Sequence, residues 1–292
     1  MNTDFITNNM KYKLSFAFFL LLLAGTQSTA QPSLNFNKRY VECEDKWVAF
    51  SITKDSTYPY GFIYIDEQAG LTFDLTGFMR IGTDGKFIPG KLDTVSMKYR
   101  LEPNNVKIAV IPESKITELG LSLIPDWLEI YKRTADSIGR MVRWGYYYNH
   151  WGESAKALTY LEKAYRLNPT YKGLAFELSY AYNALEQYEK AIPVLEKAIA
   201  GNPEECLLYK ELSFAQIFLQ QLDKAGESCR NGIKHCEDKK MKAEIAYNLA
   251  YTYFTKKDKL NFDNWALETK KWADAGDRFT QNIDKMKMEL NK

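Results

Sequence analysis

Residues able to do acid–base or metal chemistry are few and scattered in this sequence of 292 residues. There are two histidines, and the four cysteines form no CxxC pair of the kind that holds zinc or a redox disulfide. Four carboxylates lie near predicted turns, at Asp66, Glu67, Asp74 and Asp84. Hydrolysis by a carboxylate pair requires two such groups on either side of one bond. Nothing in this spacing enforces that arrangement, so we expect solvated strand ends and keep a hydrolase as the least favoured interpretation.

Motifs that mark other reactions do not occur in the sequence. There is no GxSxG, no phosphate-binding P-loop and no HExxH. The formal net charge of +2 gives no strong field that would attract nucleic acid or an anionic membrane. The composition, 46% hydrophobic and 26% charged, is that of a globular protein. We therefore predict that the protein is not an enzyme, binds no cofactor and no metal, and has no nucleic-acid partner.

The first thirty residues have the pattern of a secretory signal peptide. Lys11 and Lys13 precede an apolar run over residues 14–25, and small residues follow up to Ala30. The run of about twelve residues is shorter than the roughly 20 that span a bilayer. A buried helix or an uncleaved anchor is the alternative. We assign residues 1–30 to the signal peptide, with cleavage after Ala30. The expected product is a periplasmic or extracellular protein without a stable membrane span after cleavage.

Residues 32–115 have the pattern of a β-rich domain. Polar and apolar side chains alternate over residues 46–52, 71–76, 95–101 and 106–110, as they do in half-buried strands. Residues 62–65 are continuously apolar, which indicates a central strand. Hairpin connections are predicted at Asp84-Gly85 and at residues 102–105. We expect about five to seven antiparallel strands in a small sheet or sandwich, with one face in water.

Aromatic residues gather in the first predicted strands, at Trp47, Tyr58, Tyr60, Phe62 and Tyr64. Exposed in a row, such rings could form a platform for a sugar. More often, rings of this kind form core contacts and cross-strand pairs. A carbohydrate- or cell-envelope-binding module, with the rest of the chain as its assembly platform, is therefore the alternative function.

The periodicity changes after residue 115. Residues 116–137 are predicted to form a linker and an entry helix near Trp127, and from residue 138 the chain repeats itself. Asn168-Pro169, for example, recurs as Asn202-Pro203, which is 34 residues later. A fixed period of this size, filled by two helical patterns, is the signature of a helical solenoid. The predicted fold class is α+β, with an antiparallel β-rich domain followed by an all-α solenoid.

These residues resemble the tetratricopeptide repeat, a pair of packed helices that stacks into an array. Repeats 138–171 and 172–205 carry its pattern at Trp144, Gly145, Tyr148, Ala157, Leu161, Ala164 and Pro169, and then at Leu178, Tyr182, Ala191, Leu195, Ala198 and Pro203. The resemblance is weaker over 206–239 and continues in shifted register to residue 276. Residues 277–292 look like a capping helix, which an open solenoid needs for solubility. Pro193 is unexpected inside a helix, so that helix either starts near Ile192 or is bent.

The resemblance implies a concave face lined by the first helix of each pair. The side chains expected to bind a partner there are Tyr146, Asn149, Phe176, Tyr180, Asn183, Lys210, Phe214, Phe218, Tyr247 and Tyr251. An aromatic groove with few charges suits an extended or helical peptide, and the two asparagines could hold its backbone. Alternatively, the chain fills the groove itself, with the Trp127 helix, the C-terminal helix or the strand domain. The predicted function is an exported, non-catalytic scaffold that binds a protein or peptide.

The repeat register also implies a cysteine pairing. Cys206 and Cys236 fall at the two ends of one helix pair, and these ends lie near each other. We hypothesise a disulfide between them, subject to a Cα separation limit of about 7 Å. Export makes such a bond possible. Cys229 falls inside the same pair and is expected to be a buried thiol.

Overall fold

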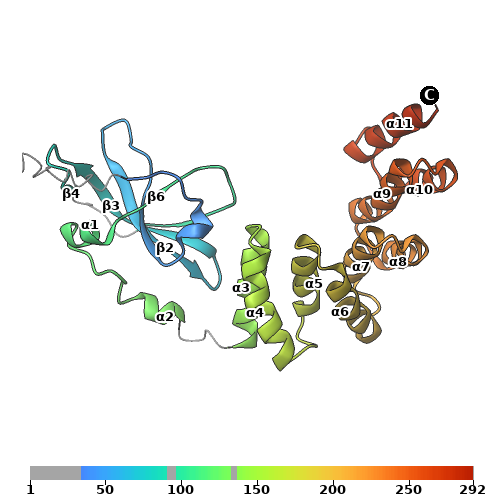
Figure 1. Ribbon diagram of the computed structural model, residues 1–292, viewed down its shortest axis with the longest axis horizontal. Helices are drawn as coiled ribbons and strands as arrows, with labels where there is room; N and C mark the ends of the chain where they lie inside the picture. Colours follow the sequence, from blue (N-terminus) through green and yellow to red (C-terminus); the bar gives the residue numbers. More distant parts are fainter. Residues whose placement is uncertain (1–33, 91–96, 133–136, 292) are drawn as a thin grey trace, which may run out of the picture.

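The computed structural model describes residues 34–90, 97–132 and 137–291 (Figure 1). The predicted signal peptide, residues 1–30, lies outside these ranges. A β-sheet comes first along the chain, two short helices follow it, and a series of longer helices begins at residue 138. The predicted fold class, an antiparallel β-rich region followed by a helical array, is confirmed.

The sheet has six antiparallel strands in the part of the chain that the structure describes. A 3-10 helix, η1 (Tyr40–Cys43), precedes β1 (Lys46–Ala49), β2 (Tyr58–Asp66), β3 (Gly70–Ile81), β4 (Phe87–Pro89), β5 (Met97–Arg100) and β6 (Ala109–Val110). The strand order is β4-β3-β2-β1-β6, and β5 also pairs with β3. The continuously apolar segment over residues 62–65 belongs to β2, which is the central strand, as predicted.

One of the two predicted hairpin connections is right. Asp84-Gly85 lies in the turn that joins β3 to β4, where Ile81 pairs with Phe87. Residues 102–105 do not form a hairpin, because β5 pairs with β3 whereas β6 pairs with β1. A local turn is present there, since the Asn104 side chain accepts from the Val106 amide at 2.8 Å. That turn sends the chain across the sheet to another strand.

Both faces of the sheet are covered, so the predicted wet face is wrong. Alternate residues of each strand point to opposite sides. Val48 and Ile63 join a core that is shared with the helical array. Trp47 and Phe62 belong to a second core beneath two short helices. These helices are α1 (Glu113–Glu118) and α2 (Leu128–Lys132). Burial on both sides explains why β2 is continuously apolar.

The remaining helices form a curved array of consecutive pairs. They are α3 (Ile138–His150), α4 (Ser154–Leu167), α5 (Leu174–Ala184), α6 (Tyr188–Gly201), α7 (Cys206–Phe218), α8 (Leu222–His235), α9 (Lys239–Thr255), α10 (Lys259–Trp272) and α11 (Arg278–Leu290). Figure 1 shows α3, α5, α7 and α9 on the inner side of the curve and α4, α6, α8 and α10 on its outer side. We call the surface formed by α3, α5, α7 and α9 the inner face.

Small residues set the spacing between paired helices. A Cβ atom added at Gly145 on α3 would lie 2.3 Å from the side chain of Leu161 on α4. Ala157 and Ala164 on α4 are fully buried in the same core. The repeated small residues therefore stand where the helices come too close for larger side chains.

The sheet covers the first end of the array. The ring of Tyr40 lies 6.2 Å from that of Trp151, at the end of α3. Arg143 donates to the carbonyl oxygen of Glu67 at 2.9 Å, and the Tyr147 hydroxyl donates to the same oxygen at 3.2 Å. The β2–β3 turn is thus fixed to α3, and the sheet acts as the N-terminal cap of the solenoid.

The last helix covers the other end. Ile283 and Met286 of α11 are buried in a core with α8, α9 and α10. The ring of Phe279 lies 5.1 Å from that of Tyr247 on α9. The segment predicted to cap the array therefore packs where the first helix of a further pair would stand.

Pro193 lies inside α6, which begins at Tyr188, so a helix start near Ile192 is wrong. A helix N–H at this position would donate to the carbonyl of Glu189, and proline has none to give. Both residues are exposed, so water can reach that carbonyl. We expect Pro193→Ala to raise the free energy of unfolding by about 1–3 kcal/mol, because alanine restores the bond and favours helix. Urea denaturation measures this difference, and an unchanged or lower stability would contradict it.

Candidate functional site

The inner face carries an open hollow between α3 and α5. Its volume is about 230 Å³, and it is lined by Tyr146, Asn149, His150, Phe176, Glu177 and Tyr180. On each helix two rings stand four residues apart and so share one face. Tyr146 stacks on His150 with ring centroids 6.2 Å apart, and Phe176 lies 6.4 Å from Tyr180. The hollow therefore has ring side chains on both walls and one carboxyl group, that of Glu177.

Four of the aromatic residues expected to contact a partner are exposed on the inner face. They are Tyr146 (44%), Tyr180 (39%), Phe218 (52%) and Tyr251 (50%). Each comes from a different inner helix, α3, α5, α7 or α9. Large exposed apolar side chains gathered on one face are candidates for contact with a partner.

The other expected rings are half-buried and pack beside the exposed ones. Phe176 lies next to Tyr180 in the hollow, as described above. Phe214 lies 4.7 Å from Phe218, and Tyr247 lies 6.3 Å from Tyr251. These contacts hold the exposed rings in place on the inner face.

Asn149 and Asn183 each bind the next inner helix. Both are buried, at 5% and 4% exposure. The Asn149 amide nitrogen donates to the backbone oxygen of Glu177 and to its carboxyl group, each at 2.9 Å. The Asn183 amide repeats this with Glu211, at 3.1 and 2.9 Å. Their amide nitrogens tie each inner helix to the next, whereas the Oδ1 atom of each asparagine has no hydrogen-bond partner among the described residues. The expected role of these residues in holding a peptide backbone stays a prediction, and it would fall to these oxygens.

Lys210 also bridges inner helices. Its ammonium group, on α7, lies 2.8 Å from the carboxylate of Glu244 on α9. Both side chains are half-buried, so this pair is better shielded from solvent than a fully exposed one. The expected basic residue of the groove is therefore already paired within the array.

Glu177 and Glu211 are site residues that the sequence reasoning missed. Burial raises the pKa of the Glu177 carboxyl, the Asn149 hydrogen bond opposes this, and the charge of Glu211 raises it further. Burial likewise raises the pKa of Glu211, against the hydrogen bond from Asn183. A signal was present in the sequence, because the two glutamates are 34 residues apart and so are the two asparagines.

The raised pKa of Glu211 gives stability a defined pH dependence. The folded state holds this proton more tightly than the unfolded chain does. The stability that protonated Glu211 contributes is therefore present below the pKa of about 4.3 in the unfolded chain. It is lost as pH rises through the pKa of Glu211 in the folded state. Glutamine carries no charge to bury and can still accept from Asn183. We expect Glu211→Gln to gain stability relative to wild type as pH rises from about 4 to about 7. Denaturation at each pH measures this, and a difference that does not depend on pH would be contrary to it.

The described residues leave the hollow open. Trp127 lies on the opposite side of the sheet, with its ring 5.8 Å from Phe62 and 4.9 Å from Tyr64. The sheet region reaches the rim of the hollow, where Glu102 pairs with His150 at 3.1 Å. The C-terminal helix was the third segment expected as an alternative occupant of the groove. This helix, α11, covers part of α9 through Phe279.

The aromatic residues of the sheet do not form an exposed platform. Trp47, Tyr60, Phe62 and Tyr64 are at most 5% exposed and belong to the core beneath α1 and α2. Tyr58 is half-buried beside them. These rings are therefore core residues, and the expected alternative of a sugar-binding platform is wrong for them.

The scattered carboxylates of the sheet hold turns and an ion pair. Asp66 accepts from the Gln68 and Ala69 amides, each at 2.8 Å. Asp74 lies 4.0 Å from the ammonium group of Lys98. Within residues 34–90, 97–132 and 137–291, no group of three or more His, Cys, Asp or Glu side chains could hold a metal ion. None of the described helices combines the length and apolarity needed to cross a membrane.

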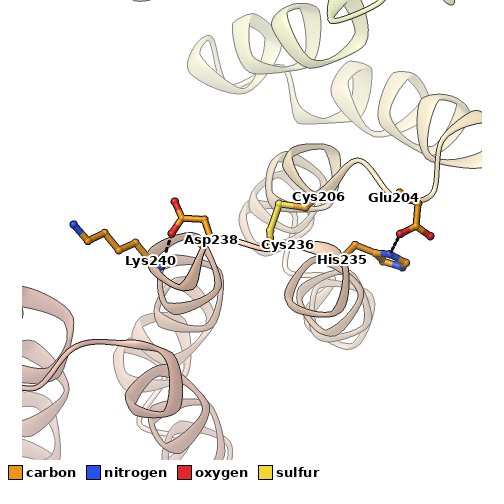
Figure 2. Close-up of a disulfide and its surroundings, with 6 residues drawn as sticks. All are labelled: Glu204, Cys206, His235, Cys236, Asp238 and Lys240. Atoms are coloured by element: carbon orange, nitrogen blue, oxygen red, sulfur yellow. Dashed lines mark hydrogen bonds and ion pairs between the residues drawn. A yellow bond between two sulfur atoms is a disulfide. The ribbon is translucent and has the colours of Figure 1, made fainter.

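A disulfide joins Cys206 and Cys236, whose Cα atoms are 5.1 Å apart. It links the start of α7 to the end of α8, next to a hydrogen bond of 2.8 Å between the His235 ring and the Glu204 carboxyl group (Figure 2). The thiol of Cys229 is buried in the same pair, and burial raises its pKa to about 12. Such a thiol is unreactive near neutral pH, because the thiolate is the nucleophile.

Comparison with known proteins bears on the helices. Residues 141–171 and 174–205 match the family model of the tetratricopeptide repeat. The match is confined to these two segments, each of which forms a helix pair typical of such arrays. The matched segments cover α3 to α6, and the later helix pairs continue the array in the structure. None of the curated proteins compared with the chain matches it.

Solved tetratricopeptide repeat structures resemble the array distantly. A thermophilic repeat protein of Thermus thermophilus is 18% identical, with 56% of this chain and 87% of that chain covered and a TM-score of 0.46. MamA from Desulfovibrio magneticus RS-1 is 17% identical, with 57% and 85% covered and a TM-score of 0.43. MamA MSR-1 is 18% identical, with 59% and 88% covered and a TM-score of 0.41. These similarities concern the fold, and we draw nothing from them about a partner.

Proposed function

We propose that this protein is a non-catalytic scaffold that binds an extended or helical segment of a partner protein on its inner face. The observation that carries the proposal is the set of four exposed rings, Tyr146, Tyr180, Phe218 and Tyr251, one from each inner helix. Stacked repeats present such concave surfaces to extended ligands. Tyrosine and phenylalanine supply large contact areas at low cost in side-chain entropy.

The packing of the array favours binding without large rearrangement. The asparagine–glutamate contacts join α3 to α5 and α5 to α7, and Lys210–Glu244 joins α7 to α9. The sheet and α11 cover the two ends. A surface held in its binding conformation loses less entropy when a ligand docks.

We also propose that the protein is exported to the periplasm or the extracellular space. The charged and apolar pattern of residues 1–30 supports this. The disulfide between Cys206 and Cys236 supports it independently, because such bonds persist in oxidising compartments.

Partner capture from a cell-envelope extract tests the binding surface. Tyr146→Ser, Tyr180→Ser and Phe218→Ser in one chain should reduce capture by about tenfold or more, because exposed aromatic anchors dominate such interfaces. The matched control is Leu260→Ser with Leu267→Ser, which removes two apolar side chains, each 74% exposed, from the outer helix α10. The control should capture the same partners as wild type. Equal capture by all three proteins, or loss in the control alone, would rule out the inner face.

A further inference from the structure

The carboxyl group of Glu177 lies among the rings of the hollow. Its Oε2 accepts from the amide nitrogen of Asn149 at 2.9 Å, and this donor is neutral. The carboxyl group of Glu211, on the next inner helix, also acts on Glu177, and its charge has the same sign. Ionised Glu177 is therefore a partly buried negative charge, with a neutral donor beside it and a like charge near it. Such a group gains from a cation.

The neighbouring part of the inner face has such a cation. Glu244 on α9 pairs with Lys210 on α7 at 2.8 Å. The six described residues that line the hollow include no lysine or arginine. His150, on the wall of the hollow, pairs with Glu102 at 3.1 Å. The hollow therefore presents an acidic group whose counter-charge would come from outside the lining residues.

The rings of the hollow also suit a cation. A guanidinium or ammonium group over the face of an aromatic ring is attracted by the negative potential of that face. Tyr146 and Tyr180 are exposed and line the hollow together with Glu177, and Phe176 lies beside Tyr180. Arginine fits such a place better than lysine, because its flat guanidinium can stack on a ring and donate to a carboxylate at once. An open hollow of about 230 Å³ admits one side chain and is too small for a folded domain.

We propose that this hollow binds an arginine side chain that projects from the partner segment. The inference rests on the proposed function, because it names the side chain that the partner inserts between α3 and α5. Apolar side chains of the same segment would lie over Phe218 and Tyr251 further along the inner face. The partner motif is therefore one arginine followed or preceded by apolar residues, and not a wholly apolar segment.

A small probe tests the hollow without the partner. N-acetyl-arginine amide is titrated into the full chain and followed by NMR, and N-acetyl-citrulline amide serves as its uncharged isostere. We expect saturable binding of the arginine probe and at least about tenfold weaker binding of the citrulline probe. Glu177→Gln should weaken arginine binding by about tenfold, and it should fold, because it removes a buried charge. Tyr251→Ala, on α9 outside the lining of the hollow, is the matched control and should bind the arginine probe as wild type does.

Three results would overturn the inference. They are equal affinity for the two probes, unchanged arginine binding by Glu177→Gln, and no saturable binding of the arginine probe. None of these affects the partner-capture test, so the scaffold proposal can stand when this inference fails. Conversely, specific arginine binding together with equal capture by the inner-face variant and its control would refute the scaffold proposal and support the chemistry of the hollow.

Discussion

Valine in place of Gly145 is expected to lower the free energy of unfolding by about 3 kcal/mol. A Cβ atom at this position would lie 2.3 Å from both Cγ and Cδ2 of Leu161, a side chain that is itself fully buried. Valine adds two further carbons in the same direction. Either α3 moves away from α4 or Leu161 leaves its rotamer, and both disturb the core that joins the sheet to the array. Urea denaturation followed by circular dichroism gives the difference.

Gly201→Val is the matched control for this substitution. Gly201 ends α6, is exposed, and has no heavy atom within 4 Å of an added Cβ. The control should change stability by no more than about 0.5 kcal/mol, as ordinary surface substitutions do. If Gly145→Val is as stable as Gly201→Val, then close approach of α3 and α4 is not what this glycine provides.

Removal of the disulfide is expected to have an effect of similar size. Cys206 and Cys236 are separated by 30 residues, and closing a loop of that length in the unfolded chain corresponds to roughly 3–4 kcal/mol. We therefore expect Cys206→Ser with Cys236→Ser to lose about that much stability in oxidising buffer. Adding a reductant should destabilise wild type to the same extent and leave the variant unchanged. A variant as stable as oxidised wild type would contradict the expectation.

The place of the disulfide in the array predicts how the reduced protein unfolds. Buried apolar residues of the sheet face that meets the array and of α3 to α7 form one core, and those of α8 to α11 form another. Between them the third repeat buries polar groups, with Ser228 donating to Gln216 at 2.8 Å. The disulfide ties α7 to α8 across this boundary. We expect two separate transitions in the reduced protein, because the boundary between the two cores falls within the third repeat, where buried polar groups stand between them. A single transition in both redox states would contradict this.

Periodicity in the sequence predicted the helices and the register between them. The residues that recur at an interval of 34 are those at which the helices pack. The register also placed Cys206 and Cys236 at adjoining helix ends. The sheet was less predictable. A wet face was expected from alternation, but the continuously apolar β2 already pointed to burial on both sides. The pairing of β5 with β3 could not be read from the local turn at residues 102–105, since strand partners are set by tertiary contacts.

The site was predicted in part. Large rings on the inner helices follow from the repeat register, and Tyr146, Tyr180, Phe218 and Tyr251 are exposed there. The contacts of Asn149 and Asn183 could not be predicted, because the sequence does not say that each faces a glutamate of the next inner helix. Which neighbour satisfies a polar side chain depends on the spacing and rotation between repeats, and these appear only in the assembled array.

Site-specific photo-cross-linking identifies the face of the array that a partner contacts. A photoreactive phenylalanine analogue replaces Tyr180 on α5 in one full-length protein and Leu267 on α10 in another, and each is irradiated with an envelope extract. Both positions are exposed, at 39% and 74%, so both can reach a bound partner by chance collision. We expect a defined cross-linked product from position 180 and none from position 267, because position 180 lies on the inner face. Cross-links from position 267 alone, or the same products from both positions, would show that the inner face is not where the partner binds.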